Sequence, residues 1–182
     1  MTTVINLFGG SGCGKSTTAA ALFSLMKRKG IHVELVREYC KYWAWNDRKV
    51  REWDQLYLLG KQSAYESMLY GKVDYIVTDS PILLAGIYQE YRSNGEHTYV
   101  GDAAKAFMKH ASDSGEVDYV NLLLKRSKPF DPRGRWETEQ EAQQIDKFVL
   151  DYLTEHYGRP PAIINGPEEN RDQEILSLVT AK

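Results

Sequence analysis

Residues 9–16 have the sequence Gly9-Gly10-Ser11-Gly12-Cys13-Gly14-Lys15-Ser16, which is the strongest pattern in the chain. They fit G-x-x-x-x-G-K-[ST] at every defined position. A β-branched stretch from Val4 to Phe8 precedes them, and apolar residues at helical spacing follow as far as Arg28. Glycines let the backbone turn its N–H groups toward anionic oxygens, and the N-terminus of a helix adds partial positive charge. Strand, glycine-rich turn and helix in this order predict a phosphate-binding loop (P-loop).

This loop predicts roles for individual residues. The phosphates of a bound nucleotide are expected against a cradle formed by Gly10, Ser11, Gly12, Cys13, Gly14, Lys15, Ser16 and Thr17. Lys15 supplies a full positive charge near the β- and γ-phosphates, and the Ser16 hydroxyl is a predicted ligand of Mg²⁺. Asp79 follows a predicted strand, where P-loop proteins place the acidic residue that holds Mg²⁺ or its water shell. We therefore expect a metal-bound nucleotide, with Ser16 and Asp79 holding the metal.

Strands and helices alternate along the chain. Strands are predicted over residues 4–8, 31–36, 73–78, 117–124 and 162–164, and helices over residues 15–28, 49–70, 81–91, 102–110, 139–156 and 168–179. Ser80 is expected to cap the helix that begins at Pro81, and Thr138 with Glu141 predicts a capping box. Such alternation predicts a three-layer α/β/α fold with a five-stranded parallel sheet. Ligands of such sheets bind at the carboxyl ends of the strands.

Composition is that of an ordinary globular protein. The 182 residues are 42% hydrophobic and 26% charged, so we expect a single domain over residues 1–182. The net charge of −2 gives no overall basic excess of the kind found in nucleic-acid binders. Two cysteines, Cys13 and Cys40, are too few for a disulfide scaffold. No apolar run approaches the roughly 20 residues that cross a bilayer, so we expect a cytoplasmic protein without a membrane partner.

Five cations gather in residues 125–137, a predicted loop broken by prolines and a glycine. They are Lys125, Arg126, Lys128, Arg133 and Arg135. Phosphoryl transfer needs positive charge around the γ-phosphate and exclusion of water, and a basic loop that closes over the nucleotide supplies both. Arg133 and Arg135 are therefore candidate catalytic arginines of a lid, and Arg126 is a third. The alternative is a solvated loop whose charges face water.

A P-loop alone does not determine the reaction. No Asn-Lys-x-Asp sequence for reading guanine occurs, which argues against a GTPase. Asp79 is followed by Ser80 and Pro81 rather than by a glutamate that would polarise water, which argues against an ATP-driven motor. These observations favour an ATP-dependent kinase that transfers the γ-phosphate to a hydroxyl. A regulatory ATPase or nucleotide-binding module without an acceptor is the alternative.

Four motifs together resemble the nucleoside- and nucleotide-kinase branch of P-loop proteins. They are the P-loop, the Arg-Glu-Tyr at 37–39, the Thr-Asp-Ser-Pro at 78–81 and the Asp-Pro-Arg-Gly-Arg-Trp at 131–136. The chain is similar to nicotinamide riboside kinase domains of bifunctional NAD-salvage proteins and to phage AAA-domain kinases. Some of these phage kinases are thought to phosphorylate 5-hydroxymethyluracil bases in DNA.

The resemblance implies a fold like that of nucleoside-monophosphate kinases, with ATP and Mg²⁺ as cofactors. It implies a nucleoside-like acceptor, which is a free nucleoside or nucleotide or a hydroxymethylated base in DNA. In the resembling kinases an acidic residue after the second strand orients the attacking hydroxyl, and Glu38 matches that position. Asn165 and Arg171 match positions that enclose adenine.

The residues around Glu38 are candidates for binding the acceptor. Arg37 either contacts a phosphate or forms a surface ion pair with Glu38. Tyr39 and Trp43 belong to an aromatic segment interleaved with basic residues. Its rings either stack on a base or pack the following helix onto the domain. Gln62, on that helix, is expected to face the acceptor pocket.

Overall fold

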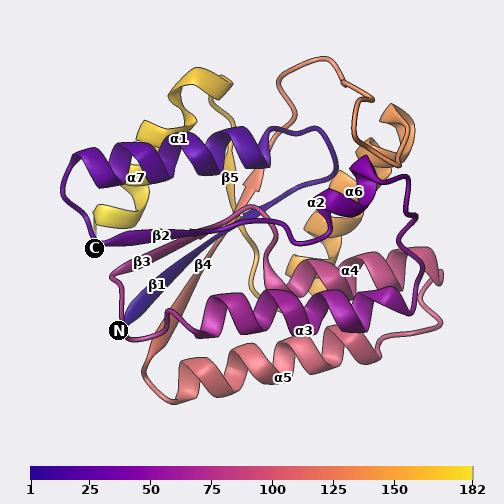
Figure 1. Ribbon diagram of the computed structural model, residues 1–182, viewed down its shortest axis with the longest axis horizontal. Helices are drawn as coiled ribbons and strands as arrows, with labels where there is room; N and C mark the ends of the chain where they lie inside the picture. The colour runs from indigo at the N-terminus through magenta and orange to yellow at the C-terminus, as the bar shows by residue number, and fades with distance from the viewer. Residues whose placement is uncertain (182) are drawn as a thin grey trace.

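The computed structural model of the protein describes residues 1–181, and its central element is a five-stranded sheet (Figure 1). The strands are β1 (Thr2–Phe8), β2 (Val33–Val36), β3 (Tyr75–Thr78), β4 (Val117–Leu124) and β5 (Ala162–Ile164). Neighbouring strands are all parallel, and their order is β2-β3-β1-β4-β5. The P-loop therefore leaves the middle of the sheet at its carboxyl edge.

Helices cover both faces of this sheet and make three layers, as predicted. The α-helices are α1 (Lys15–Arg28), α2 (Lys41–Trp45), α3 (Asp54–Ser67), α4 (Ile82–Arg92), α5 (Tyr99–Asp113), α6 (Glu139–Asp151) and α7 (Arg171–Thr180). A π-helical turn, η1 (Tyr152–His156), continues α6, and a 3-10 turn, η2 (Glu168–Asn170), precedes α7. No helix within residues 1–181 is long and apolar enough to cross a membrane.

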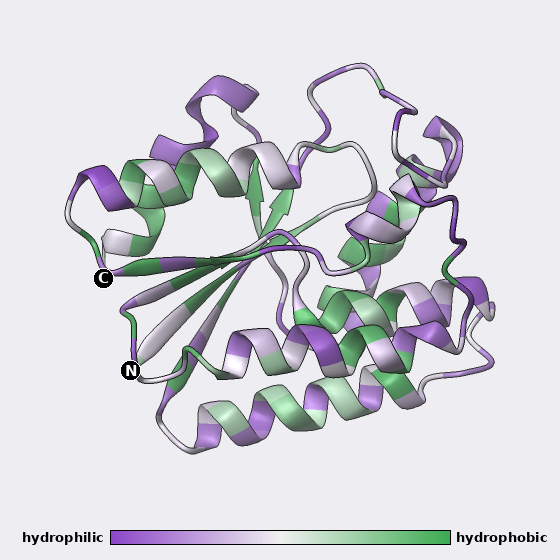
Figure 2. Ribbon diagram, in the orientation of Figure 1, coloured by the Kyte–Doolittle hydropathy of each residue, from purple (hydrophilic) through white to green (hydrophobic). Residues whose placement is uncertain are grey.

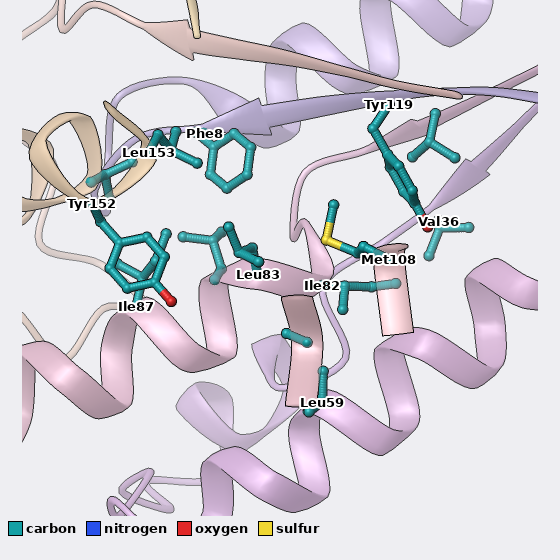
Figure 3. Packing of buried hydrophobic residues seen from close by; sticks show 14 of the residues in the cluster. Phe8, Val36, Leu59, Ile82, Leu83, Ile87, Met108, Tyr119, Tyr152 and Leu153 are labelled. Atoms are coloured by element: carbon teal, nitrogen blue, oxygen red, sulfur yellow. The ribbon is translucent and has the colours of Figure 1, made fainter. Parts of the chain in front are cut away.

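Two hydrophobic cores fill the space between the layers. Side chains of β1 alternate between them, because successive residues of a strand face opposite sides. Val4 and Phe8 lie in the core under α4 and α5, whereas Ile5 and Leu7 face α1 and α7. Figure 2 shows hydrophobic residues along the strands and in stripes between polar residues on the helices. In Figure 3, Phe8 lies beside Leu153 in the first of these cores.

The predicted elements are confirmed, with changes at their ends. The capping box of α6 forms, since Thr138 Oγ1 accepts from Glu141 N and Glu141 Oε2 accepts from Thr138 N. The predicted cap at Ser80 is wrong, because α4 begins one residue later and no side chain caps it. Ser80 N instead donates to Thr78 Oγ1 at 3.1 Å.

The helix predicted from residue 49 begins only at Asp54. The Asp54 carboxylate accepts a hydrogen bond from Arg51 N at 2.9 Å, which holds a turn in front of the helix. Upstream, α2 forms in the aromatic segment, where no helix was predicted. This short helix buries none of its residues, so it lacks the apolar periodicity that reveals a packed helix.

Candidate active site

The P-loop has the backbone that its sequence predicts. Gly9, Gly12 and Gly14 have φ angles of 137°, 82° and 98°, a region that side chains other than glycine rarely adopt. Lys15 is the first residue of α1, and its Nζ donates to the carbonyl oxygens of Gly9 and Gly10 at 2.7 and 3.0 Å. A full positive charge is thus held against the loop at the N-terminus of a helix, where an anion is favoured.

A buried arginine supports the P-loop from behind. The guanidinium of Arg171 donates to the carbonyl oxygens of Cys13 at 2.9 Å and Gly166 at 3.1 Å, to Ser127 Oγ at 3.0 Å, and to Lys125 O. Its side chain is fully buried. Arg171 therefore joins the P-loop to the chain that follows β4 and β5. Because its N–H groups are directed at protein oxygens, its place is that of a brace rather than of a contact to adenine.

Asp146 of α6 is a second support, which the sequence did not predict. Its Oδ1 accepts from Gly10 N, and its Oδ2 accepts from Arg126 Nε and Nη2 at 3.2 and 2.9 Å. Arg126 thereby lies next to Gly12 of the P-loop. The remaining Nη1 of Arg126 is buried and has no hydrogen-bond partner within the described residues. A free, buried cationic donor beside the cradle fits the charge-stabilising role predicted for Arg126.

A cavity extends from the P-loop across the ends of β2 and β3 to α3 and α4. Among the predicted site residues, it is lined by Ser11, Gly12, Gly14, Lys15, Ser16, Thr17, Glu38, Tyr39, Gln62, Asp79 and Arg135. The remaining predicted residues lie outside its lining: Gly10, Cys13, Arg37, Trp43, Arg126, Arg133, Asn165 and Arg171. The structure therefore brings the predicted nucleotide side and the predicted acceptor side into one cavity.

Two oxygen donors suited to Mg²⁺ meet in this cavity. Ser16 lies in the first turn of α1, and Asp79 follows β3. Asp79 is buried, and its Oδ1 accepts a hydrogen bond from Glu38 N at 2.9 Å, while no hydrogen bond to Oδ2 forms within residues 1–181. Mg²⁺ typically takes one or two protein oxygens together with phosphate oxygens and waters. A hydroxyl and a carboxylate fit that requirement, and no cluster of three or more His, Cys, Asp or Glu in the described chain offers another metal site.

Glu38 faces the cavity beside Asp79. The Cys40 thiol donates to Glu38 Oε1 at 3.2 Å. Burial, assisted by the nearby Glu38 carboxylate, raises the pKa of the Cys40 thiol, so Cys40 stays a protonated donor at neutral pH. Arg37 is exposed, and the ion pair with Glu38 that was one of its two predicted roles does not form. No cation within residues 1–181 therefore forms an ion pair with the Glu38 carboxylate.

The basic loop (residues 125–137) places its two predicted lid arginines differently. Arg135 lines the cavity, and its Nη1 donates to Ser11 Oγ at 3.2 Å. Arg133 instead pairs with Asp131 at 2.8 Å, and its side chain is 84% exposed. The Arg133 guanidinium lowers the pKa of Asp131 to about 2 through hydrogen bonds. Only Arg135 of this pair reaches the P-loop.

The short helix α2 touches the basic loop on the acceptor side. Lys41 Nζ donates to the carbonyl oxygen of Gly134 at 3.2 Å, and the Trp45 ring packs on Gly134. A Cβ at residue 134 would lie 3.0 Å from that ring, and Gly134 has a φ of 66°. Glycine is therefore required here both for the turn and for the close approach.

The aromatic segment mainly packs α2 onto α3. The rings of Trp43 and Tyr57 are inclined by 16° with centres 6.0 Å apart, and the Arg48 guanidinium lies 3.4 Å from the Trp43 ring centre. Tyr39 shares a 2.8 Å hydrogen bond with the Tyr57 hydroxyl. Packing thus accounts for Trp43, whereas Trp53 is 63% exposed.

Other cavity residues were not predicted: Lys41, Gln55, Tyr88, Arg92, Trp136 and Glu137. Gln55 did carry a signal, because it precedes Gln62 by seven residues on the same face of a helix. Arg92 and Glu137 pair at 3.7 Å across 45 positions of sequence, and no local pattern connects them. Burial, with Glu137 and Glu38 nearby, raises the pKa of Tyr88, so its hydroxyl stays protonated.

Comparisons with solved structures show which proteins share this fold. The deoxyadenosine kinase from M. mycoides matches with a TM-score of 0.63 and 17% identity, over 98% of this chain and 100% of that one. The Mycobacterium tuberculosis APS kinase CysC in complex with AMPPNP and APS matches with a TM-score of 0.54 and 15% identity, over 98% of this chain and 97% of that one. APE1195 matches with a TM-score of 0.54 and 18% identity, over 99% of this chain and 95% of that one.

At these identities the likeness shows the fold alone, which is the three-layer α/β/α fold with a five-stranded parallel sheet that the sequence predicted. A comparison with proteins of curated function finds no match. The AAA domain family AAA_28 matches residues 4–171, which is nearly the whole chain. The protein therefore belongs to the AAA domain family.

Proposed function

We propose that this protein is an ATP-dependent kinase that transfers the γ-phosphate to a hydroxyl of a nucleoside-like acceptor. One observation carries the proposal: a single cavity joins the P-loop, with Lys15, to Glu38, and Arg135 reaches it from the basic loop. A nucleotide-binding module without an acceptor has no need for a second, polar half of the cavity next to a carboxylate.

In this reaction the acceptor oxygen attacks the γ-phosphorus, and the bond from that phosphorus to the bridging oxygen of ADP breaks. The hydroxyl proton passes to the Glu38 carboxylate, which lies at the end of β2. Lys15, Arg135 and the free Nη1 of Arg126 offset negative charge on the transferring group. Mg²⁺ at Ser16 and Asp79 would supply further charge stabilisation of the phosphate oxygens. Residues 125–137 act as a lid that excludes water.

Two further lines support the proposal. Two proteins of similar fold are kinases, one with bound dCMP and dCDP and the other with AMPPNP and APS. The motif resemblance to nicotinamide riboside kinases and phage AAA-domain kinases also favours a nucleoside-like acceptor. These likenesses support the class of reaction and leave the acceptor to experiment.

The test is to incubate the protein with γ-labelled ATP, Mg²⁺ and a panel of nucleosides, nucleotides and DNA. We expect label on an acceptor, and its loss in Lys15→Ala, because this substitution removes the charge at the P-loop. Label that reaches only inorganic phosphate would instead identify a regulatory ATPase.

One surface feature favours a second candidate, a hydroxymethylated base carried in DNA. Tyr42, Trp45 and Trp53 are each more than 60% exposed. The guanidinium of Arg51 lies 5.0 Å from the centre of the Trp53 ring, and that of Arg48 lies on the neighbouring Trp43. Aromatic rings with interleaved cations suit single-stranded nucleic acid. DNA binding that weakens steeply with added salt would favour this candidate.

A further inference from the structure

The acceptor half of the cavity is electrically balanced. We define it by the side chains of Glu38, Lys41, Gln55, Gln62, Tyr88, Arg92 and Glu137. It contains two cations and two carboxylates, and both cations already have protein partners. Arg92 pairs with Glu137 at 3.7 Å and donates to Val50 O at 2.8 Å, while Lys41 donates to Gly134 O.

A phosphate on the acceptor would fit this half poorly. It would have to share each cation with a carboxylate or a carbonyl oxygen that the cation already contacts, and it would lie near the carboxylates of Glu137 and Glu38. The Glu137 side chain is only 11% exposed, so water screens the repulsion weakly. Arg37, the cation expected to contact a phosphate, is exposed and outside the cavity lining.

Two buried carboxamides offer hydrogen bonds of another kind. Gln55 and Gln62 are each 4% exposed and line the cavity from α3. Gln62 Nε2 donates to Thr78 Oγ1 at 3.4 Å, and the side chain of Gln55 makes no hydrogen bond within residues 1–181. The amide of Gln55 has no protein partner in the described part of the chain and is not among the buried polar atoms shut off from solvent, so it is open to the cavity and able to bind a group there. An amide presents both a donor and an acceptor, which matches an uncharged polar edge.

The walls between these amides are apolar. Leu58 lies between Gln55 and Gln62 on α3, and Leu84, Ala85 and the ring of Tyr88 line the cavity from α4. Two helical walls of this kind suit a flat ring. Gln62 lies at Thr78, next to the Asp79 and Glu38 end, whereas Gln55 lies about 10 Å farther along α3.

We propose that the group bound in the acceptor half is an uncharged ring that carries the hydroxyl, a nucleoside or a base, and that a phosphate of the acceptor is excluded from this half. Gln62 positions the reacting end, and Gln55 determines specificity by hydrogen bonding the far edge of the ring. The inference rests on the proposed kinase function and narrows its substrate class. The same uncharged ring is available from a free nucleoside or from an unpaired base in a DNA strand whose phosphates stay outside the acceptor half.

The experiment measures kcat/KM for matched pairs of a nucleoside and its 5′-monophosphate, including 5-hydroxymethyl derivatives, and for a single-stranded oligonucleotide with the same base. For the wild-type chain we expect nucleosides to be preferred over their monophosphates by about 100-fold, since like charges in such a site cost several kcal/mol. Label on the oligonucleotide but not on free nucleosides would support the uncharged acceptor and identify DNA as its source. Equal use of monophosphates would overturn the inference and leave the kinase function standing, whereas no labelled acceptor at all would overturn both.

Substitution of Gln55 tests its role in specificity. Gln55→Ala should lower kcat/KM for the acceptor by about 10-fold or more while KM for ATP is unchanged, because the lost amide faces the acceptor half alone. Gln173→Ala, at an exposed glutamine of α7, is the matched control. Gln55→Leu keeps the volume of the side chain and replaces the first variant if that one unfolds. An unchanged acceptor kcat/KM in a folded Gln55 variant would refute the role of Gln55.

Glu137→Gln tests the charge argument in the opposite direction. It releases Arg92 and removes one negative charge from the acceptor half. Use of the monophosphate relative to the nucleoside should rise by about tenfold. An unchanged ratio would show that the charge balance does not exclude phosphate.

Discussion

The two halves of the cavity are built with different degrees of internal support. On the nucleotide side, the fully buried Arg171 and the part-buried Asp146 hold the P-loop through its own backbone groups. On the acceptor side, α2 buries none of its residues and meets the basic loop through Trp45, which is 66% exposed. Segments with few buried contacts open at a lower free-energy cost than core elements.

This difference indicates that, in the proposed reaction, the P-loop is a preformed binding site whereas the acceptor side changes conformation. A preformed P-loop spends little binding free energy on ordering itself around phosphates. An acceptor side held by surface contacts is able to open for a substrate and to close again before transfer. Substitutions in the two halves should therefore have different signatures, in stability for the first and in kinetics for the second.

Arg171→Ala should have the largest effect on stability. It removes a cation and leaves four buried or part-buried oxygen acceptors without their donor. Unsatisfied groups of this kind cost about 1–3 kcal/mol each, so we expect a loss of about 4 kcal/mol in the free energy of unfolding. Urea denaturation measures it. A loss below about 1 kcal/mol would show that the P-loop does not depend on this brace.

Glu66 lies in the last turn of α3, beyond the part of this helix that lines the cavity. It is fully buried, and its Oε1 accepts from the Tyr70 hydroxyl at 2.6 Å. Burial raises the pKa of Glu66 to about 7 from an ordinary 4.5, although the Tyr70 hydrogen bond opposes this. Between those pH values the folded chain holds a proton that the unfolded chain has released, so stability should fall as pH rises from about 4.5 to about 7.

Above about pH 7, Glu66 is ionised in both the folded and the unfolded chain. The free energy of unfolding has then fallen by its full amount, about 3 kcal/mol. Glu66→Gln should abolish this slope in urea midpoints measured from pH 5 to 8. Because Glu66 is fully buried, bonds to Tyr70 and lies outside the cavity lining, the same variant should leave transfer kinetics unchanged. A fall in kcat would instead place this end of α3 in the site.

Arg135→Ala and Arg133→Ala compare two neighbouring arginines with different surroundings. Arg135 reaches Ser11 of the P-loop, and its loss should lower kcat by about 100-fold with little change in ATP affinity. Arg133 is exposed and paired with Asp131, so its removal should change kcat less than threefold. Equal effects would mean that the basic loop adopts another arrangement during transfer. No effect from Arg135→Ala would refute its role in the lid.

Trp45→Ala should have the smallest effect on stability. Its ring packs on Gly134 but remains mostly in solvent, so we expect a loss of about 1 kcal/mol or less. If this contact helps to close the acceptor side, KM for the acceptor should rise severalfold while KM for ATP stays constant. Steady-state kinetics with each substrate varied in turn measures KM for the acceptor and KM for ATP separately.

Local sequence was sufficient to predict the geometry of the P-loop itself. The glycine spacing, Lys15 and Ser16 act through backbone geometry within one turn, so a short pattern contains most of the physics. Asp79 and Glu38 were predictable because both follow strands, and the ends of parallel strands meet at one edge of the sheet. Ser80 was predicted wrongly, because cap preferences are weak relative to the packing that positions α4.

Contacts between distant segments could not be predicted in the same way, on either side of the cavity. Arg133 and Arg135 look equivalent in sequence, and only the folded loop turns one toward Ser11 and the other toward Asp131. Likewise, no pattern near Arg171 in the sequence predicts that its guanidinium bonds to oxygens of Cys13, Lys125 and Ser127, which lie more than 40 positions away.

The sequence alone determined the order of strands and helices, the P-loop and the edge of the sheet at which polar residues gather. Hydrophobic periodicity, turn residues and the ends of strands are local properties, so a sequence pattern contains them. The tertiary structure alone decided which charges are already paired, which amides remain free and which arginine is buried. Those outcomes depend on contacts between residues far apart in the chain, such as Arg92 with Glu137, which no local pattern encodes.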